Sequence, residues 1–314
     1  MNYSLVRNIV FSFFVLSAVL FSDNSLLLAA EPAPGLQILK LDRPISFNVP
    51  ENFRRAQDPF KLGTADGYMP TRRGLDALRI SGSRFFSQPE LTKILYSLPE
   101  KDVVILDLRG EAHGYLNGNG MSWYSAYKRI NFGKTAAVVE AEENKLLAGV
   151  AKQEVEVATL GKDKSVVAVD MMQVQQTLSE RELAARNNVK YYRIPVSDYT
   201  PPTAENVEQF LAFYKNLPAD AWVHLHCEAG EGRTTTFMAM IDMIHNANRV
   251  SYDDIMIRQW LLGGQDIRSA TDNDPWKKEA YKKRAAFTKL FYAYVQQNPK
   301  LDLSWNDWLL KQRQ

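Results

Sequence analysis

Short runs of apolar residues along this 314-residue chain predict buried β-strands. The clearest run, residues 103–108, is interrupted only by Asp107, as is typical of a strand covered on both faces of a parallel sheet. A second run at 221–225 is equally apolar. Weaker patterns predict strands at 36–41, 78–83 and 189–194.

Helical periodicity fills most of the intervals between these strands. After the strand at 221–225, Phe237, Met240, Ile241 and Ile244 recur at helical spacing. Further helices are predicted at 88–98, 174–187, 204–217 and 252–262, and Asp274-Pro275 predicts the start of a long final helix. Alternation of strands and helices predicts an α/β fold with a central, mostly parallel sheet flanked by helices.

One segment does not follow this alternation. Residues 152–160 and 165–169 are rich in β-branched residues, alternate in polarity and are separated by a polar turn at 161–164. This pattern predicts a hairpin with one polar face. We therefore expect a small inserted β-rich module formed mainly by about residues 136–170.

The most informative stretch is His-Cys-Glu-Ala-Gly-Glu-Gly-Arg-Thr-Thr, at residues 226–235. It places Cys227 at the end of a predicted strand, followed by a turn with two glycines, then Arg233 and a helix. Such a turn points backbone N–H groups inward, and the helix N-terminus adds unpaired donors, so the loop can bind an anion. Arg233 can grip two phosphate oxygens, and the same positive field favours the thiolate of Cys227. The alternative is an inert, buried cysteine.

Composition narrows the choice of function. The formal net charge of +2 gives no basic excess that would suggest a nucleic-acid partner. Cys227 is the single cysteine, so no intramolecular disulfide can form. The four histidines show no paired spacing with cysteine, so we expect no metal site.

The N-terminal segment has the layout of a signal peptide. Arg7 precedes an apolar run at 9–21, and small residues end at Ala30 before Glu31-Pro32. We expect residues 1–30 to be removed and the protein to be exported to the periplasm or secreted, with no stable membrane association afterwards. A membrane anchor is the alternative, although the run is short for a spanning helix.

The loop Cys-x5-Arg-Thr resembles the active-site loop of the protein tyrosine phosphatase (PTP) superfamily. The longer string at 226–235 resembles the PTP-like inositol polyphosphatases (PTP-like phytases) of bacteria. The resemblance implies a PTP fold with a partial β-barrel beside it, no cofactor, and a phosphatase domain over residues 31–314. It departs from the expected pattern at Glu231, an acid that we expect to face away from phosphate.

The resemblance also implies roles for residues of the loop. Cys227 is the expected nucleophile, Arg233 holds the phosphoryl group, and Thr234 hydrogen-bonds the thiolate. The backbone of residues 228–232, namely Glu228, Ala229, Gly230, Glu231 and Gly232, contributes the phosphate cradle. Asp198, on the proline-containing loop 195–202, is the expected general acid, although an Asx turn before a helix cap at Thr203 is an alternative.

Residues outside the loop are expected to form a wider substrate pocket. Arg54 in Asn-Phe-Arg, and Glu111 and His113 in Asp-Leu-Arg-x-Glu-x-His-Gly, match the family at these points. On the last helix Lys277, Tyr281 and Arg284 share one face. Tyr199 is a further candidate contact, and Gln265 a candidate for positioning the attacking water. For the cations, the alternative is exposure on the surface. For Glu111 and His113, the alternative is hydrogen bonding within the loop expected at 109–118, after the strand at 103–108.

These residues predict a two-step hydrolysis of phosphate monoesters through a cysteinyl-phosphate, most active on the acidic side of neutrality. The cations around the loop favour a polyanionic small molecule, inositol hexakisphosphate (phytate) or lower inositol polyphosphates. A phosphotyrosine protein phosphatase is the alternative with the same chemistry. A non-catalytic binder of inositol phosphates or phosphoproteins is the alternative of another class.

Overall fold

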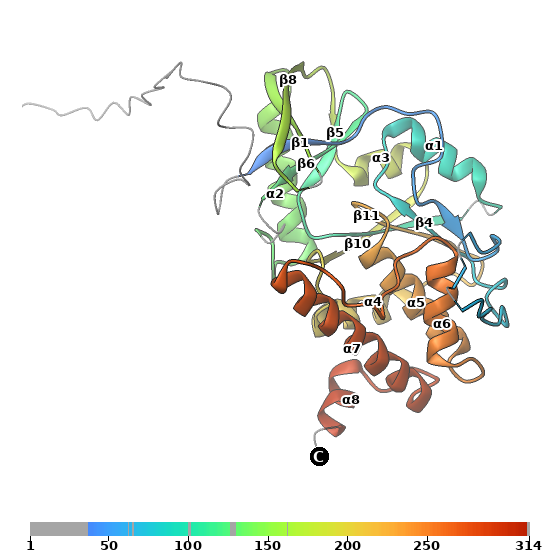
Figure 1. Ribbon diagram of the computed structural model, residues 1–314. Helices are drawn as coiled ribbons and strands as arrows, with labels where there is room; N and C mark the ends of the chain where they lie inside the picture. The colour runs from blue at the N-terminus through green and yellow to red at the C-terminus, as the bar shows by residue number, and fades with distance from the viewer. Residues whose placement is uncertain are drawn as a thin grey trace, which may run out of the picture.

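The computed structural model describes residues 37–61, 63–64, 66–99, 102–125, 130–161 and 163–312. Its two sheets and the helices around them confirm the α/β prediction (Figure 1). The predicted signal peptide at 1–30 lies outside the described residues. Among the helices of the described ranges, none is long and apolar enough to cross a membrane.

The central sheet has five strands in the order β10–β4–β11–β3–β2. Its strands are β2 (Arg54–Arg55), β3 (Ile80–Arg84), β4 (Val103–Arg109), β10 (Lys190–Val196) and β11 (Trp222–Cys227). The first four in spatial order pair in parallel, and only β2 runs antiparallel, against β3. The carboxyl ends of β3, β4, β10 and β11 therefore meet at one edge, which is where open α/β sheets bind ligands.

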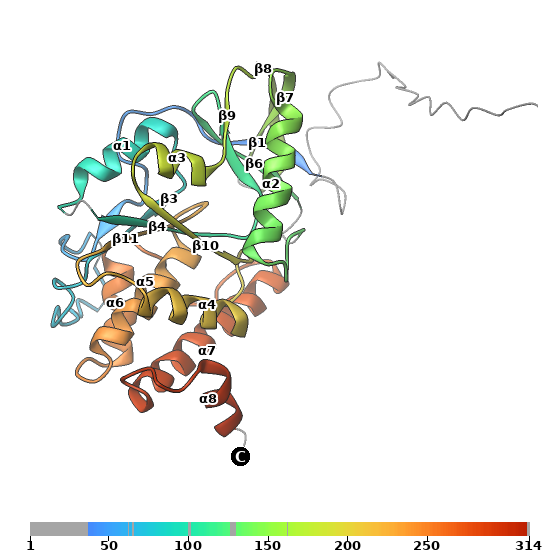
Figure 2. The same cartoon turned by 180° about the vertical axis from the view of Figure 1, so that it is seen from behind.

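Helices cover both faces of this sheet (Figures 1 and 2). On one face lie α4 (Ala204–Lys215), α5 (Gly232–Asn246), α6 (Tyr252–Leu261), α7 (Pro275–Gln297) and α8 (Trp305–Lys311); on the other lie α1 (Gln88–Ser97) and α3 (Glu180–Arg186). Strand β4 packs against an apolar core on each face of the sheet. Leu106 and Leu108 belong to the larger core, and Val103 and Ile105 belong to the smaller one. Alternate residues of a strand point to opposite faces, so a strand buried on both sides is almost continuously apolar.

A second sheet of six strands stands beside the first, in the order β8–β7–β1–β6–β5–β9. Its strands are β1 (Ile38–Arg43), β5 (His113–Leu116), β6 (Asn119–Tyr124), β7 (Glu154–Leu160), β8 (Val166–Gln173) and β9 (Thr177–Leu178). It has an apolar core of its own, with Met121, Trp123, Val157 and Leu147 of helix α2 (Ala136–Val150). The predicted hairpin is its β7–β8 pair.

The prediction of a β-rich module over about 136–170 is wrong in its first half. Residues 136–150 form α2, capped by the Thr135 side chain, with Val139, Glu143 and Leu147 buried at a four-residue spacing. The sheet takes its other strands from distant parts of the chain, since β1, β5 and β6 precede that range. Long-range pairing of this kind leaves no local signal in the sequence.

Two other predicted boundaries shift for identifiable reasons. The helix expected over 174–187 begins only at Glu180, because Ser179 and Glu182 form a capping box and residues 177–178 pair with β5. The loop expected at 109–118 contains β5, which pairs with β6. In contrast, the final helix begins as predicted, with the Asp274 side chain accepting from the backbone of Trp276 at 2.9 Å.

Candidate active site

The loop of residues 227–233, called the phosphate loop below, connects β11 to α5 at the carboxyl edge of the central sheet. Three of its carbonyls are held from outside. The carbonyl of Glu228 accepts from Phe85 N at 3.0 Å, that of Ala229 from Asn52 Nδ2 at 2.8 Å, and that of Gly230 from Arg54 Nη1 at 2.9 Å. Because the N–H of a trans peptide points away from its C=O, the amides that follow these carbonyls point into the loop. The loop is thus an anion-binding nest at a helix N-terminus.

Cys227 lies at the bottom of this nest, with 3% of its surface exposed. The Thr234 hydroxyl donates to its sulfur at 3.3 Å. Glu231 occupies the position before α5 without capping it through its side chain, and that side chain is exposed. The backbone donors of the first turn of α5 therefore stay directed at the nest.

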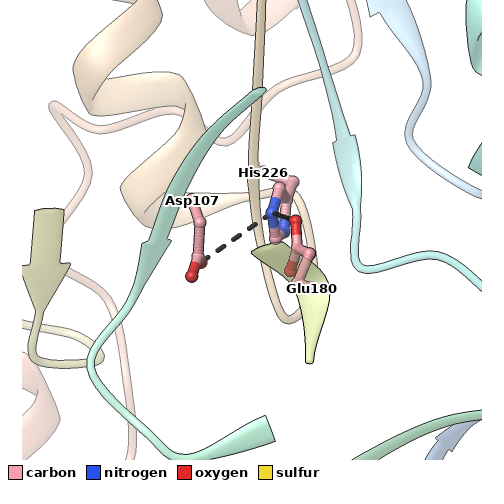
Figure 3. Close-up of side chains that lie close together, drawn as sticks. All are labelled: Asp107, Glu180 and His226. Atoms are coloured by element: carbon pink, nitrogen blue, oxygen red, sulfur yellow. Dashed lines mark hydrogen bonds and ion pairs between the residues drawn. The ribbon is translucent and has the colours of Figure 1, made fainter. Parts of the chain in front are cut away.

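Behind Cys227, a buried polar cluster joins β11 to α3 and β4 (Figure 3). His226 Nε2 lies 2.7 Å from one oxygen of Glu180, and His113 Nε2 lies 2.9 Å from the other. Asp107 Oδ2 accepts from the Tyr191 hydroxyl at 2.8 Å and is 3.2 Å from Arg193 Nε. The cluster fixes the strand end that carries Cys227.

The same cluster offers one atom each from Asp107, Glu180 and His226 within 4.8 Å of one another, a spacing at which a metal ion could bind. All three side chains are fully buried, and each already contacts an oppositely charged or hydrogen-bonding partner. A divalent cation would compete with Arg193 and the two histidines for the same oxygens. The residues fit a hydrogen-bonded network better than a metal site, and the expected lack of a metal stays a prediction.

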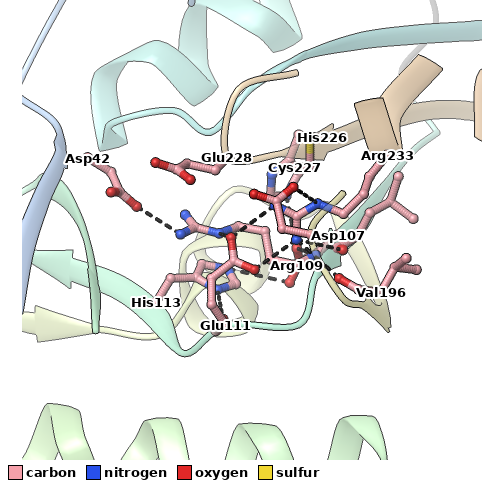
Figure 4. Close-up of polar contacts among 12 residues, drawn as sticks. Asp42, Asp107, Arg109, Glu111, His113, Val196, His226, Cys227, Glu228 and Arg233 are labelled. Carbon is pink, nitrogen blue, oxygen red and sulfur yellow. Dashed lines mark hydrogen bonds and ion pairs between the residues drawn. The ribbon is translucent and has the colours of Figure 1, made fainter. Parts of the chain in front are cut away.

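Arg233 is held by an acidic residue that follows β4, the strand next to β11 (Figure 4). Its two terminal nitrogens donate to the two oxygens of Glu111, Nη1 at 2.8 Å and Nη2 at 3.1 Å. Nη1 also donates to the carbonyl of Val196 at 3.1 Å, at the end of β10. A two-point contact of this kind fixes the plane of the guanidinium as well as its position.

Asp198 lies beside this arginine, on the loop that follows β10. Its Oδ1 is 3.3 Å from Arg233 Nε and accepts from the backbone of Tyr199 at 3.1 Å. Thr203 caps α4 with its own side chain, so the cap does not need Asp198. This arrangement favours the acid's facing the phosphate loop over the alternative of a turn before the helix cap.

Tyr199 holds the same loop against α7. Its backbone has a φ of 65°, a left-handed conformation that is unfavourable for a tyrosine. Its ring packs edge-on to Trp276, with centroids 6.0 Å apart, and the Lys277 ammonium lies 5.2 Å above it. The ring of Tyr281 also lies beside that of Tyr199, with centroids 6.2 Å apart. Packing against α7 offsets the backbone strain.

Arg284 comes from the same helix and borders the phosphate loop. A Cβ placed on Gly232 would lie 2.2 Å from its Nη1, and its Nη2 donates to Gln265 Oε1 at 2.8 Å. Lys277 and Tyr281 are half-buried, whereas Lys278, Lys282 and Lys283 are exposed. The structure therefore brings Lys277, Tyr281, Arg284 and Gln265 to one side of the loop.

Arg54 lies beneath the loop and is fully buried. Its Nη2 donates to Thr235 Oγ1 at 3.0 Å, in addition to the bond from Nη1 to Gly230. Burial lowers the pKa of Arg54 to about 10, against the opposing influence of Cys227 and Glu231. Arg54 thus supports the loop from below rather than lying on the protein surface.

Glu111 and His113 do not lie where residues that line a substrate pocket would lie. Glu111 holds Arg233, and His113 lies in the cluster around Glu180; both side chains are buried. They can position the residues that contact a ligand, but they do not line an open pocket. Lys40, Asp42, Arg109 and Glu180 were missed from the sequence, because nothing in the local pattern of β1, β4 and α3 shows that they converge.

Gly230 gives a test of the nest. Its φ is +74°, and an added Cβ would lie 2.3 Å from the backbone of Ser83 and Arg84, so Gly230→Ala combines backbone strain with a backbone clash. Gly133, with a φ of +77° and open space around it, is the matched control. We expect Gly133→Ala to lower the free energy of unfolding by about 1–2 kcal/mol. Gly230→Ala should lower the free energy of unfolding by more than this. It should also weaken the binding of inorganic phosphate, measured by calorimetry. Equal effects of the two variants on both measurements would contradict the nest.

Glu180 gives a test of the cluster behind Cys227. Burial would raise the pKa of Glu180, but the charge of His226 and the hydrogen bonds from both histidines outweigh it and hold the pKa well below 4.5. A carboxylate whose pKa is depressed on folding stabilises the protein above its unfolded-state pKa, and this stability is lost as the pH falls through the folded-state pKa.

We therefore expect Glu180→Gln to reduce the free energy of unfolding by several kcal/mol at pH 6. The difference from the unmodified protein should shrink steadily as the pH is lowered from 5 to 3.5. Urea unfolding at each pH measures it. A difference that is constant with pH would mean that Glu180 is not ionised in the folded protein.

Comparison with known proteins agrees with this geometry. The family model of PTP-like phytases, described as "Inositol hexakisphosphate", matches residues 106–245. The chain is 27% identical over 256 residues to effector protein hopD2 of Pseudomonas syringae pv. tomato, covering 76% of this chain and 53% of that protein.

Solved structures resemble most of the chain. The tandemly repeated PTP-like phytase of Mitsuokella multacida is 36% identical with a TM-score of 0.85, covering 89% of this chain and 48% of that one. A PTP-like myo-inositol phosphatase from the same organism was solved in complex with myo-inositol-(1,3,4,5)-tetrakisphosphate. It is 37% identical with a TM-score of 0.83, and the match covers 90% of this chain and 50% of that one. A PTP-like phytase from Bdellovibrio bacteriovorus is 27% identical with a TM-score of 0.71, covering 90% and 99%.

The chain spans about half the length of hopD2 and of the two Mitsuokella chains. The structural matches nevertheless cover about nine-tenths of this chain, and the range matched by the family model includes the phosphate loop. The chain is therefore similar to the PTP-like phytases, both in its match to the family model and in a fold that resembles theirs over most of its length.

Proposed function

We propose that this protein is a cysteine-dependent phosphatase that removes phosphates from phytate and lower inositol polyphosphates. The observation that carries the proposal is the convergence of a nucleophile, an anion nest and an acid at one edge of the sheet. Thr234 contacts Cys227 at 3.3 Å, Glu111 fixes Arg233, and Asp198 lies 3.3 Å from Arg233.

The reaction has two steps. The Cys227 thiolate attacks phosphorus and forms an S–P bond, the ester P–O bond breaks, and Asp198 gives its proton to the leaving alcohol oxygen. Arg233 and the loop amides stabilise the equatorial oxygens, where negative charge gathers. Water then attacks the cysteinyl-phosphate and loses a proton to Asp198. The S–P bond breaks, inorganic phosphate leaves, and Thr234 stabilises the returning thiolate.

The cations around the nest support a substrate with several phosphates. Arg284 borders Gly232, and Lys277 lies next to Tyr199 on the same side. A single phosphate fills the nest alone, whereas the further phosphates of an inositol polyphosphate would contact these outer cations. The Mitsuokella relative that was solved with inositol tetrakisphosphate supports the same class of substrate.

The direct test is phosphate release from phytate at about pH 5 by the unmodified protein, Cys227→Ser and Asp198→Asn. We expect release by the unmodified protein, none by Cys227→Ser, and a rate about 10²–10⁴-fold lower for Asp198→Asn. The rate should peak on the acidic side of neutrality, because the acid must start protonated. An optimum above pH 8 would contradict the role of Asp198.

Two outcomes would favour the alternatives. Turnover of a phosphotyrosine peptide without release from phytate would keep the chemistry and overturn the substrate. Binding of phytate without turnover of either substrate would favour a non-catalytic binder, although binding alone requires neither the thiol of Cys227 nor the acid of Asp198.

We further propose that the protein is exported. Support comes from the sequence alone, with Arg7 before the apolar run at 9–21 and small residues up to Ala30. Expression of the full chain in a bacterial host should yield a periplasmic or secreted product whose N-terminus is Glu31. Edman sequencing of that product measures the cleavage site, and an intact N-terminus on a cytoplasmic product would contradict export.

A further inference from the structure

Strand β1 has two of its charged residues buried and its apolar residues half-buried, the reverse of the usual pattern. Lys40 and Asp42 are 6% and 8% exposed. Leu39 and Leu41, on the opposite side of the strand, pack on the core of the six-stranded sheet. Alternate residues of a strand point to opposite sides. The apolar side of β1 therefore faces the core of the six-stranded sheet, and its charged side faces the phosphate loop.

The charged side of β1 contacts the phosphate loop directly. The Lys40 ammonium forms an ion pair with Glu228, the residue after the nucleophile, and lies 2.8 Å from Asp42 Oδ1. The second oxygen of Asp42 is 2.8 Å from Arg109 Nη2, at the end of β4. Burial alone would raise the pKa of Asp42, but the charges of Lys40 and Arg109 keep that pKa below its usual value.

Arg109 links these charged residues to the other end of the phosphate loop. Its Nε donates to Glu111 Oε1 at 2.9 Å, and the same oxygen accepts from Arg233 Nη2 at 3.1 Å (Figure 4). The full series alternates in sign: Glu228, Lys40, Asp42, Arg109, Glu111, Arg233. It begins and ends on the phosphate loop and passes through the second sheet.

Buried charges of this kind depend on each other. Removing one member of a buried ion pair leaves its partner's charge unpaired, which costs several kcal/mol or forces the partner to move. If Asp42 lost its charge, Arg109 would draw more strongly on Glu111, with which it also forms an ion pair. Glu111 is the residue that sets the plane of Arg233.

We propose that Lys40 and Asp42 are positioning residues, through which the six-stranded sheet holds Glu228 and Arg233 in register for phosphoryl transfer. The proposal rests on the proposed phosphatase function. It gives the second sheet a part in the reaction: β1 contacts Glu228 directly through Lys40 and reaches Arg233 through Arg109 and Glu111. Neither residue touches the reacting atoms.

The test compares Lys40→Met and Asp42→Asn with Arg43→Met. Arg43 lies on the same strand and donates to buried Glu90 at 2.9 Å, but its contacts lead to α1 and Glu51 rather than to the phosphate loop. All variants should lose thermal stability. Lys40→Met and Asp42→Asn should also lose about 10–100-fold in kcat on phytate, with KM within about threefold, because a misplaced Arg233 impairs the transition state more than the bound substrate. Arg43→Met should keep its kcat.

Two further variants separate positioning from mere stability. Lys40→Arg retains the charge and should recover most of the lost kcat. Lys40→Met combined with Glu228→Gln should have a higher kcat than Lys40→Met alone, because the second change removes the carboxylate that Lys40 otherwise balances beside Cys227.

Several results would overturn the proposal. A kcat of Lys40→Met and Asp42→Asn equal to that of Arg43→Met would make the series a structural contact only. A raised KM with unchanged kcat would mean that Lys40 binds substrate itself. If the unmodified protein does not hydrolyse phytate, the proposed function fails, and calorimetric binding of inorganic phosphate replaces kcat. Weaker binding by the two β1 variants than by Arg43→Met would then support positioning, and equal binding would overturn it.

Discussion

The site depends on one buried contact, the two-point ion pair between Glu111 and Arg233. A guanidinium that must bind a phosphoryl group cannot be left to rotate, and a carboxylate matched to both of its terminal nitrogens fixes its plane. Glu111 can do this because it follows β4, and Arg233 because it opens α5 after β11, the strand next to β4. The parallel pairing of these strands thus places both residues at one edge.

The charges around this contact divide into paired and weakly paired groups. Arg233, Arg109 and Arg193 each meet a buried carboxylate, as buried cations generally require. Arg54 and Arg284 differ: among the described residues, their hydrogen bonds go to neutral acceptors, namely backbone carbonyls, Thr235 and Gln265. Burial lowers the pKa of both. Arg54 supports the phosphate loop from below, whereas Arg284 borders the nest at Gly232, so a polyanion in the nest would provide Arg284 with a charged partner.

The sequence was sufficient for the parts of the site that are local. The stretch 226–235 predicts strand, nest and helix together, because each is encoded within a few residues, and α7 was predicted to carry Lys277, Tyr281 and Arg284 on one face. Glu111 and His113 are found as candidate residues, but their placement stays open between pocket and internal hydrogen bonds, since a strand-end motif does not show whether a side chain points to solvent or inward. Lys40 and Asp42 could not be found, because a charged pair in an imperfectly alternating strand predicts exposure. Their burial follows only from the pairing of β1 between β6 and β7, which joins segments more than 70 residues apart.

The acid and the outer cations are linked through α7. Tyr199 adopts a left-handed backbone next to Asp198, a conformation that costs roughly 1–2 kcal/mol for a residue with a Cβ. Trp276, Lys277 and Tyr281 pack on its ring and offset that cost. The helix that carries Arg284 to Gly232 therefore also holds the loop of Asp198. Because one element carries both contacts, a shift of α7 that removed Arg284 from the nest would also remove the packing that holds Tyr199 beside Asp198.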